Sequence, residues 1–157
     1  MSFVIRQGDI FQSSADVLVN AVNCIGIMGG GIAKAFADRF PDCVPPYVTA
    51  CRNKALAIGR GLVWQDPQSP IFIVQAPTMI RPGSKAQLSD IKKTVEWIAH
   101  ALVLAPTCTI AIPALGCGIG GLDWEDVANV IRTRFSAPDV SRHCILFYAP
   151  WGVDIEI

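Results

Sequence analysis

The chain has 157 residues with 13 basic and 13 acidic side chains, so it carries no formal net charge; 52% of its residues are hydrophobic and 17% are charged. This length suits one domain that buries roughly 70% of its unfolded surface, and the composition excludes a disordered chain, which needs low hydrophobicity and high net charge. The lack of a basic excess argues against a protein that holds duplex nucleic acid by bulk charge.

The first part of the chain alternates apolar runs with helical patterns. Phe3 to Ile5 predicts a short strand, and Asp16 to Ala21 predicts a strand buried on both faces, because it is almost continuously apolar and β-branched. After a glycine-rich stretch, a helix that ends at Pro41 is predicted from apolar residues on one helical face. These residues are Ile32, Ala33, Phe36, Ala37 and Phe40.

The middle of the chain predicts two helices and two strands. Pro45-Pro46 favours the first turn of a helix that residues 59–61 close. Strands are predicted over residues 62–65 and 71–75, and residues 76–83 are interpreted as a loop with two prolines. Ser84 and Gln87 match a capping box, which predicts a helix from there to about Leu104.

The last part repeats the same order. Cys108 to Ile112 predicts another buried strand, and a second glycine-rich loop follows Pro113. Asp123 can cap the next helix, and His143 to Ala149 predicts a final strand. Because strands alternate with helices throughout, we expect one α/β domain over residues 1–157, with a mixed, largely parallel sheet sandwiched between helices.

The sequence favours a cytoplasmic protein. Its amino terminus is charged too early for a signal peptide, and no apolar run reaches the ~18 residues of a membrane-spanning helix. The six cysteines form no CxxC pair, so we expect reduced, mostly buried thiols rather than a zinc site or a disulfide scaffold.

Both glycine-rich loops, over residues 26–31 and 116–121, are predicted to lie where a buried strand ends and a helix begins. Ligands of open α/β sheets bind at this place, and free amides at a helix start favour an anion. Two such loops could hold a diphosphate from both sides without a lysine. The alternative is a pair of ordinary tight turns, since neither loop fits GxxxxGK[ST] and only Gly116-x-Gly118-x-x-Gly121 matches GxGxxG.

The chain resembles the macrodomain family of ADP-ribose-binding α/β/α modules along essentially its whole length. The matching segments are Gln7-Gly8-Asp9-Ile10, Val19-Asn20-Ala21-Val22-Asn23, Gly26-Ile27-Met28-Gly29-Gly30-Gly31-Ile32-Ala33, and Ile112-Pro113-Ala114-Leu115-Gly116-Cys117-Gly118-Ile119-Gly120-Gly121-Leu122-Asp123-Trp124. The glycine loops are most similar to the branch that contains DNA ADP-ribosylglycohydrolase antitoxins and terminal ADP-ribose glycohydrolases.

The resemblance implies roles for individual residues. Asp9 would accept a hydrogen bond from the adenine amino group, the Ile10 backbone would lie beside the ring, and Asn23 would contact the distal ribose as the residue most closely tied to catalysis. The two glycine loops would hold the diphosphate and enclose that ribose. The implied ligand-binding residues are Asp9, Ile10, Asn20, Gly26, Met28, Gly29, Gly30, Gly31, Ile32, Thr78, Leu115, Gly116, Cys117, Gly118, Ile119 and Gly120.

Structural alternatives remain for some of these residues. Asp9 could be a turn or cap residue, and Asn23 could bond the loop backbone. Cys117 fits a small filler of a tight loop better than a nucleophile, because no base is spaced to activate it. No metal ligand and no cofactor are expected, with ADP-ribose as ligand or product.

One position departs from the antitoxin-like branch, which places a lysine after the Pro-Thr of the middle strand. Here Pro77-Thr78 is followed by Met79, whose thioether cannot attack a sugar carbon or act as a base. Lys85 could substitute only if the loop folds back. Where some members have an acid in the second loop, this chain has Gly120.

The sequence therefore supports three hypotheses. The first is an ADP-ribosyl hydrolase that removes ADP-ribose from a nucleobase or an acidic protein side chain. The second is a binding module without turnover, and the third is an ADP-ribose 1″-phosphate phosphatase. We expect a monomer that does not bind membranes, with ADP-ribose, ADP-ribosylated DNA or ADP-ribosylated protein as partner; the antitoxin resemblance also implies an ADP-ribosyltransferase toxin.

Overall fold

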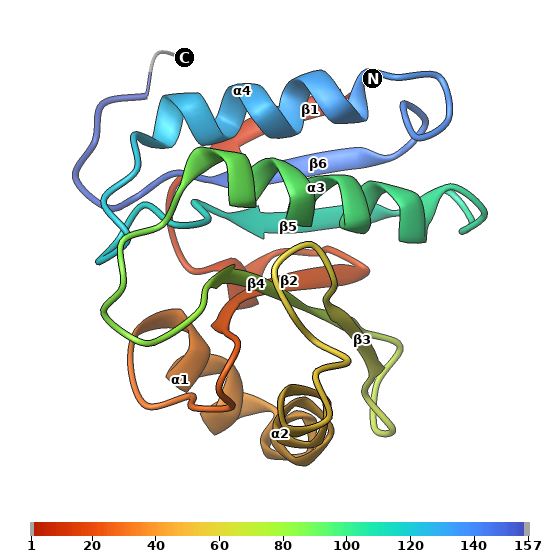
Figure 1. The fold of residues 1–157 in the computed structure, drawn as a ribbon. Coiled ribbons are helices and arrows are strands. Elements are labelled where there is room, and N and C mark those ends of the chain that lie inside the picture. The colour runs from red at the N-terminus through yellow and green to blue at the C-terminus, as the bar shows by residue number, and fades with distance from the viewer. Residues whose placement is uncertain (1, 156–157) are drawn as a thin grey trace.

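A six-stranded sheet forms the centre of the computed structural model, which describes residues 2–155 (Figure 1). The strand order is β1-β6-β5-β2-β4-β3, and every neighbouring pair is parallel except β3 with β4. The strands are β1 (Ser2–Arg6), β2 (Val17–Asn23), β3 (Leu62–Gln65), β4 (Phe72–Met79), β5 (Thr109–Pro113) and β6 (Cys144–Tyr148). The predicted α/β sheet is therefore confirmed.

Helices cover both faces of this sheet. They are α1 (Gly31–Arg39), α2 (Val44–Arg52), α3 (Leu88–Leu102) and α4 (Trp124–Phe135), with the short 3₁₀ helices η1 (Ile10–Gln12) and η2 (Pro41–Cys43). Figure 1 shows α3 and α4 together on one side of the sheet and α1 with α2 on the other side. Asp123 caps α4 as predicted, since its Oδ1 accepts a hydrogen bond from the Glu125 amide at 2.9 Å.

Strand β2 shows why its sequence is almost continuously apolar. Val17 and Val19 pack in the core beneath α3 and α4, whereas Leu18 packs in the core that contains Phe36 of α1. Successive side chains of a strand point to opposite faces, so a strand covered on both faces needs apolar residues at every position.

Strand β4 continues to Met79, so the prediction of a loop from residue 76 is wrong. The strand keeps its pairing with β2 through Pro77, whereas its pairing with β3 ends at Gln75. The missing N–H of Pro77 is therefore tolerated, because one side of β4 has no partner strand there. The Pro77 carbonyl accepts a hydrogen bond from Thr94 Oγ1 of α3 at 2.8 Å.

Two predicted helix boundaries also need correction. Helix α2 ends at Arg52 rather than near Gly59, because Lys54 adopts a positive φ of 57° that no α-helix continues. Helix α3 begins at Leu88 with Gln87 as its N-cap and without a side-chain cap. Ser84 lies in a turn instead, where its amide donates to the Arg81 carbonyl, so the capping box does not form.

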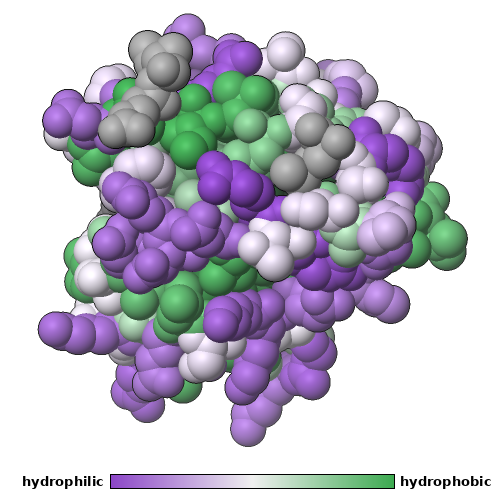
Figure 2. Space-filling model, turned by 90° about the horizontal axis from the view of Figure 1, so that it is seen from above, coloured by the Kyte–Doolittle hydropathy of each residue, from purple (hydrophilic) through white to green (hydrophobic). Residues whose placement is uncertain are grey.

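The six cysteines are free thiols in the structure. Cys43 and Cys51 are buried, whereas the other four are only partly covered, so the expectation of mostly buried thiols holds for two of them. No helix within residues 2–155 is long and apolar enough to cross a membrane. On the face over α4 and β1, hydrophilic side chains form most of the surface and apolar side chains show as separate areas (Figure 2).

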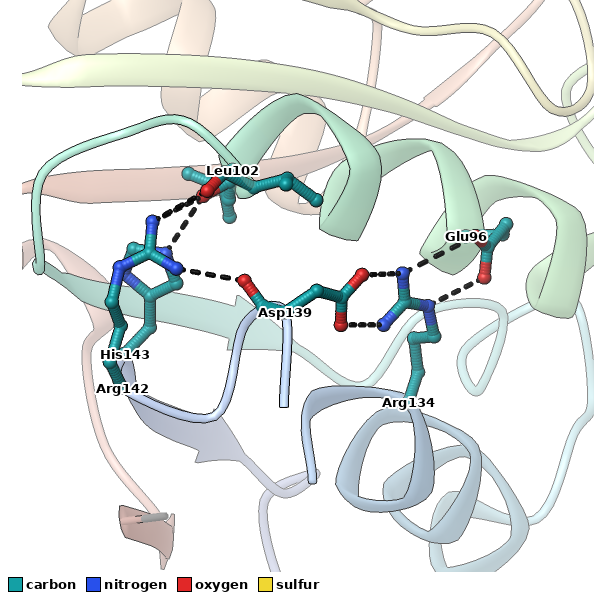
Figure 3. A network of polar contacts seen from close by, with 7 residues as sticks. Glu96, Leu102, Arg134, Asp139, Arg142 and His143 are labelled. Carbon is teal, nitrogen blue, oxygen red and sulfur yellow. Dashed lines mark hydrogen bonds and ion pairs between the residues drawn. The ribbon is translucent and has the colours of Figure 1, made fainter. Parts of the chain in front are cut away.

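A network of charged side chains ties α3 to α4 and to the turn before β6 (Figure 3). Arg134 of α4 donates to Glu96 of α3 at 2.6 Å and to both carboxylate oxygens of Asp139 at 2.9 Å. Arg142 donates to the carbonyl of Leu102, the last residue of α3, and to those of Val103 and Ala105 just beyond it. The Leu102 carbonyl, which has no partner within the helix because it ends α3, thereby gains a donor.

This network predicts a pH-dependent contribution to stability. The Arg134 guanidinium lowers the pKa of the Asp139 carboxyl below its usual value, mainly through their hydrogen bonds. The folded state therefore favours the ionised form, and the resulting stability is complete above the pKa of the unfolded chain and is lost as the pH falls through the lower folded-state pKa. We expect Arg134→Gln to reduce the free energy of unfolding at pH 7 and to have a smaller effect well below about pH 4.

Urea denaturation at several pH values measures this difference. Lys92→Gln serves as the control, because Lys92 is exposed on α3 and belongs to no ion pair among residues 2–155. If the difference in unfolding free energy between wild type and Arg134→Gln stayed constant from pH 7 to pH 3, the pH-dependent contribution would not come from the Arg134–Asp139 pair.

Candidate functional site

A cleft of about 640 Å³ opens where the carboxyl ends of β1, β6, β5 and β2 come together. Ligands of open α/β sheets bind at this edge. The residues that line it come from five separate segments: Gly8, Asp9, Ile10, Phe11, Ala21, Ile32, Pro113, Ala114, Cys117, Gly118, Tyr148, Ala149, Pro150 and Trp151. The cleft thus brings together predicted site residues that lie more than one hundred positions apart in the chain.

Asp9 stands at the β1 end of the cleft and caps η1, because its Oδ1 accepts a hydrogen bond from the Phe11 amide at 2.9 Å. Its Oδ2 lies 3.5 Å from the Arg39 guanidinium, which itself stacks over the Phe11 ring. The carboxylate remains partly exposed at 40% of its side-chain surface. Asp9 is therefore a cap residue that still offers an acceptor to the cleft.

Three aromatic residues of the cleft, Phe11, Tyr148 and Trp151, were not predicted as site residues from the sequence. Tyr148 ends β6, and Trp151 follows two residues after Ala149 with 78% of its surface exposed. An exposed tryptophan beside a cleft offers a flat apolar face on which a ring can stack. The available signal was a tryptophan directly after a buried strand, at the sheet edge where ligands bind.

The Asn23 side chain holds the segment over residues 24–30, which contains most of the glycine-rich stretch 26–31 and is called the first glycine loop from here on. Asn23 Oδ1 accepts hydrogen bonds from the amides of Ile25 and Ile27 and from Tyr47 Oη, and Nδ2 donates to the Ile27 carbonyl at 2.7 Å. Burial raises the pKa of Tyr47 well above its usual value, so the phenol stays protonated and donates. The structure therefore places Asn23 beneath the loop, where one of its amide N–H groups has no partner among the described residues.

The same loop leads into α1 with open backbone amides. Gly30 is the N-cap of α1 and provides no side-chain hydrogen bond. A Cβ built on Gly30 or Gly31 would meet nothing within 4 Å, so the bare backbone faces open space. Since the first amides of a helix lack partners within it, this helix start can bind an anionic group.

The second glycine loop, residues 115–121, packs tightly against the segment before α3. A Cβ on Gly120 would lie 2.5 Å from the Gly116 carbonyl oxygen and 2.9 Å from Ala86 Cβ. Gly116 has a positive φ of 73° and similarly close neighbours, whereas Gly118 has open space around it. Gly120 is buried, and there is no room for a side chain at this position. Some members of the resembled branch are expected to carry an acidic residue here.

Two predicted ligand-binding residues lie inside the sheet rather than in the cleft. Asn20 is completely buried and donates through Nδ2 to Gln75 Oε1 of β4 at 2.9 Å. Thr78 is 2% exposed within β4. The structure does not bring Asn20 to the cleft, because even-numbered residues of β2 point toward α1 and α2 beneath the sheet. Its amide therefore acts as a cross-strand contact.

The remaining predicted residues divide into buried and exposed groups. Ile10 and Leu115 are buried, so they can offer only backbone atoms to a ligand. Met28 and Cys117 are partly covered, and Ile119 is 78% exposed. Among residues 2–155, no three His, Cys, Asp or Glu side chains lie together in a way that could hold a metal ion.

The family model of the Macro domain matches residues 19–131.

The chain belongs to the Macro domain family.

Several relatives extend this match. A DNA ADP-ribosyl glycohydrolase of Mycobacterium tuberculosis is 34% identical over 148 residues, which cover 92% of this chain and 41% of the relative. A DNA ADP-ribosyl transferase-DNA ADP-ribosyl glycohydrolase fusion protein of Thermosipho africanus is 28% identical over 142 residues, covering 80% of this chain and 37% of the relative. The chain thus spans about two fifths of the length of these curated relatives.

A solved structure matches the fold closely. Thermosipho africanus DarTG in complex with ADP-ribose has a TM-score of 0.88 and 25% identity, and the match covers 99% of this chain and 43% of that chain. The six-stranded sheet with its flanking helices is therefore the macrodomain architecture that the sequence predicted.

Met79 lies directly beside Asn23 in this macrodomain. The two residues are partners in the β2–β4 register, which shifts between Val22 and Asn23. Met79 therefore occupies the sheet edge at the first glycine loop, yet it brings no basic group there. The chain does turn back beyond it, through a turn in which the Ser84 amide donates to the Arg81 carbonyl, and Lys85 is exposed on the returning segment.

Cys117 stays a thiol in this setting. Burial raises its pKa to about 12, and Asp123 and Asp126 add to the shift. Because the thiolate is the nucleophilic form, a raised pKa argues against covalent chemistry at this cysteine. The prediction of a small side chain filling a tight loop agrees with this environment.

Loss of Asn23 is expected to disturb ligand binding as well as any turnover. Asn23→Ala removes the acceptor of the part-buried Ile25 and Ile27 amides and one of the two acceptors of the Tyr47 hydroxyl, and each lost hydrogen bond costs about 0.5–1.5 kcal/mol. We expect the affinity for ADP-ribose to fall about tenfold or more in isothermal titration calorimetry. Asn129→Ala on exposed α4 is the control, and an unchanged affinity in Asn23→Ala would show that the loop holds its shape without this side chain.

Close packing of the second loop predicts unequal effects of two similar substitutions. Gly120→Ala forces a methyl group against the Gly116 carbonyl and Ala86, so we expect a loss of about 1–3 kcal/mol of stability. Gly118→Ala has open space and should leave the unfolding free energy nearly unchanged. Urea denaturation of both variants measures the contrast, and equal stability of the two would refute the packing argument.

Proposed function

We propose that this macrodomain binds ADP-ribose and releases it by hydrolysis from a modified base of DNA. The observation that carries the proposal is the pair of glycine loops at the ends of β2 and β5: the first leads into the uncapped start of α1, and the second lines a cleft that has an acceptor at Asp9 and that Ile32 of α1 also lines. These features suit a diphosphate held by backbone amides and an adenine held at the β1 end.

The similarity to DNA ADP-ribosyl glycohydrolases supports the choice of reaction. In that reaction the bond between C1″ of the distal ribose and the base nitrogen breaks, its electron pair leaves with the base, and a water oxygen adds to C1″. One proton of this water ends on the released base nitrogen and its hydroxyl stays on C1″, so the products are the unmodified base and free ADP-ribose. With Met79 in place of a lysine, such a reaction relies on positioning and on electrostatic stabilisation by fixed dipoles rather than on a protein nucleophile.

Asn23 is the side chain that we assign to the distal ribose. Its Oδ1 is engaged with the loop amides and Tyr47, so the group available to the ribose is the remaining Nδ2–H. An amide N–H can donate to a ribose hydroxyl and keep the sugar oriented, although it cannot accept a proton from water. Asn23 thus acts by positioning both the loop and the sugar.

A binding module without turnover is the second candidate function. It is favoured by Met79 at the site and by the full use of Asn23 Oδ1 within the protein. Both candidates require ADP-ribose to bind in the cleft, so binding alone does not separate them.

Calorimetry with ADP-ribose tests the shared requirement, and we expect saturable binding that is weakened in Asp9→Asn. Product analysis then separates the candidates, with three substrates: ADP-ribosylated thymidine DNA, an ADP-ribosylated glutamate peptide and ADP-ribose 1″-phosphate. Release of ADP-ribose from the DNA supports the proposal. Binding without release from any substrate supports the binding module, and no binding up to millimolar ADP-ribose would exclude both.

We further propose a cytoplasmic monomer that acts together with an ADP-ribosyltransferase. The fusion of a DNA ADP-ribosyl transferase with a DNA ADP-ribosyl glycohydrolase in the Thermosipho africanus relative supports this pairing. The two activities are complementary, because one attaches the group that the other removes.

A further inference from the structure

The loop between β4 and α3, residues 80–87, links the two glycine loops. At its start, the Ile80 carbonyl accepts a hydrogen bond from the Cys24 amide of the first loop at 3.0 Å. Near its end, the Ala86 amide donates to the Gly120 carbonyl of the second loop, also at 3.0 Å. The Arg81–Ser84 turn lies between these two anchors. The loop is therefore fixed against both sides of the predicted diphosphate site.

The order of the strands places this loop at one end of the bound ligand. Asp9 follows β1, Trp151 follows β6, the second glycine loop follows β5, the first follows β2, and residues 80–87 follow β4. A linear ligand whose diphosphate lies between the two glycine loops has one end toward Asp9 and Trp151. Its other end then lies toward β4, so whatever is attached to the distal sugar meets the 80–87 loop.

The side chains around that end combine apolar and basic character. Ile80 is 59% exposed and Ile27 of the neighbouring first loop is 50% exposed. Arg81 and Lys85 are exposed on the same loop and take part in no ion pair among the described residues. This is a local concentration of positive charge in a chain whose net charge is zero.

We propose that the 80–87 loop recognises the DNA beyond the bond that is cleaved: Ile80 and Ile27 pack against the modified base, and Arg81 and Lys85 contact phosphates of the flanking strand. Exposed apolar side chains suit a base ring better than the carboxyl group of a modified glutamate, and unpaired cations suit a phosphate backbone. The inference rests on the proposed function, because it assumes that ADP-ribose occupies the cleft with its adenine at the β1 end.

Two substrates that differ only in the flanking strand test the inference. One is a single-stranded oligonucleotide that contains one ADP-ribosylated thymidine, and the other is the ADP-ribosylated thymidine nucleoside alone. The variants are Arg81→Gln and Ile80→Ser, with Lys92→Gln as a control of the same charge change on the outer surface of α3. For each protein, kcat/KM on both substrates, affinity for free ADP-ribose, and affinity for the modified oligonucleotide at several salt concentrations are measured.

Each variant has its own expected pattern. Arg81→Gln should reduce kcat/KM several-fold on the oligonucleotide and leave the nucleoside unchanged. It should also reduce the slope of log affinity against log salt concentration by about 0.7, the value for one single-strand phosphate contact. Ile80→Ser should reduce kcat/KM on both substrates. Affinity for free ADP-ribose should stay the same in all variants, and Lys92→Gln should behave as wild type.

The outcomes separate the inference from the proposed function. The inference is wrong if kcat/KM on the nucleoside equals that on the oligonucleotide. It is also wrong if Arg81→Gln and Ile80→Ser have wild-type kcat/KM on the oligonucleotide. Either result leaves the proposed hydrolase function intact. Faster release from an ADP-ribosylated glutamate peptide than from the oligonucleotide overturns the choice of DNA. Binding of the modified oligonucleotide that is tighter than ADP-ribose and depends on Arg81, but without release, supports the inference and removes the hydrolase.

Discussion

Parallel pairing of β1, β6, β5, β2 and β4 is the constraint on which the rest of this macrodomain depends. Parallel strands end at the same edge of a sheet, so the five segments that follow them meet there although they are spread along the whole chain. Asp9, the two glycine loops, Trp151 and the 80–87 loop are separated in the sequence and become one surface only through this pairing. The β3 strand is antiparallel, and it contributes no lining residue to the cleft.

The proposed diphosphate site relies on backbone amides rather than on a cluster of lysines or arginines. Open backbone at Gly30, Gly31 and Gly118 lets a ligand approach the main chain, and the start of α1 has no side chain competing for its amides. This arrangement agrees with a chain of zero net charge.

Shape at the site is maintained by neutral polar contacts and by close packing. Asn23 Oδ1 accepts hydrogen bonds from an amide of the first glycine loop and from the Tyr47 hydroxyl. In the second glycine loop, Gly116 and Gly120 pack closely against Ala86. Such contacts hold the loops at defined separations, which matters most for a reaction that proceeds by orienting the sugar and water. Met79 removes one route to catalysis, the lysine nucleophile, and thereby increases the reliance of any turnover on this fixed geometry.

The sequence by itself determined the strand and helix order, the two glycine loops, the Asp123 cap and the family, because these depend on local patterns and on short motifs. It did not predict that β4 extends through Pro77, since that depends on which side of β4 lacks a partner strand. It also placed Asn20 at the ligand and overlooked Trp151. Only the tertiary structure decided these points. Contacts between residues far apart in the chain determine toward which face of the sheet a residue of β2 points and which segments meet at one edge of the sheet.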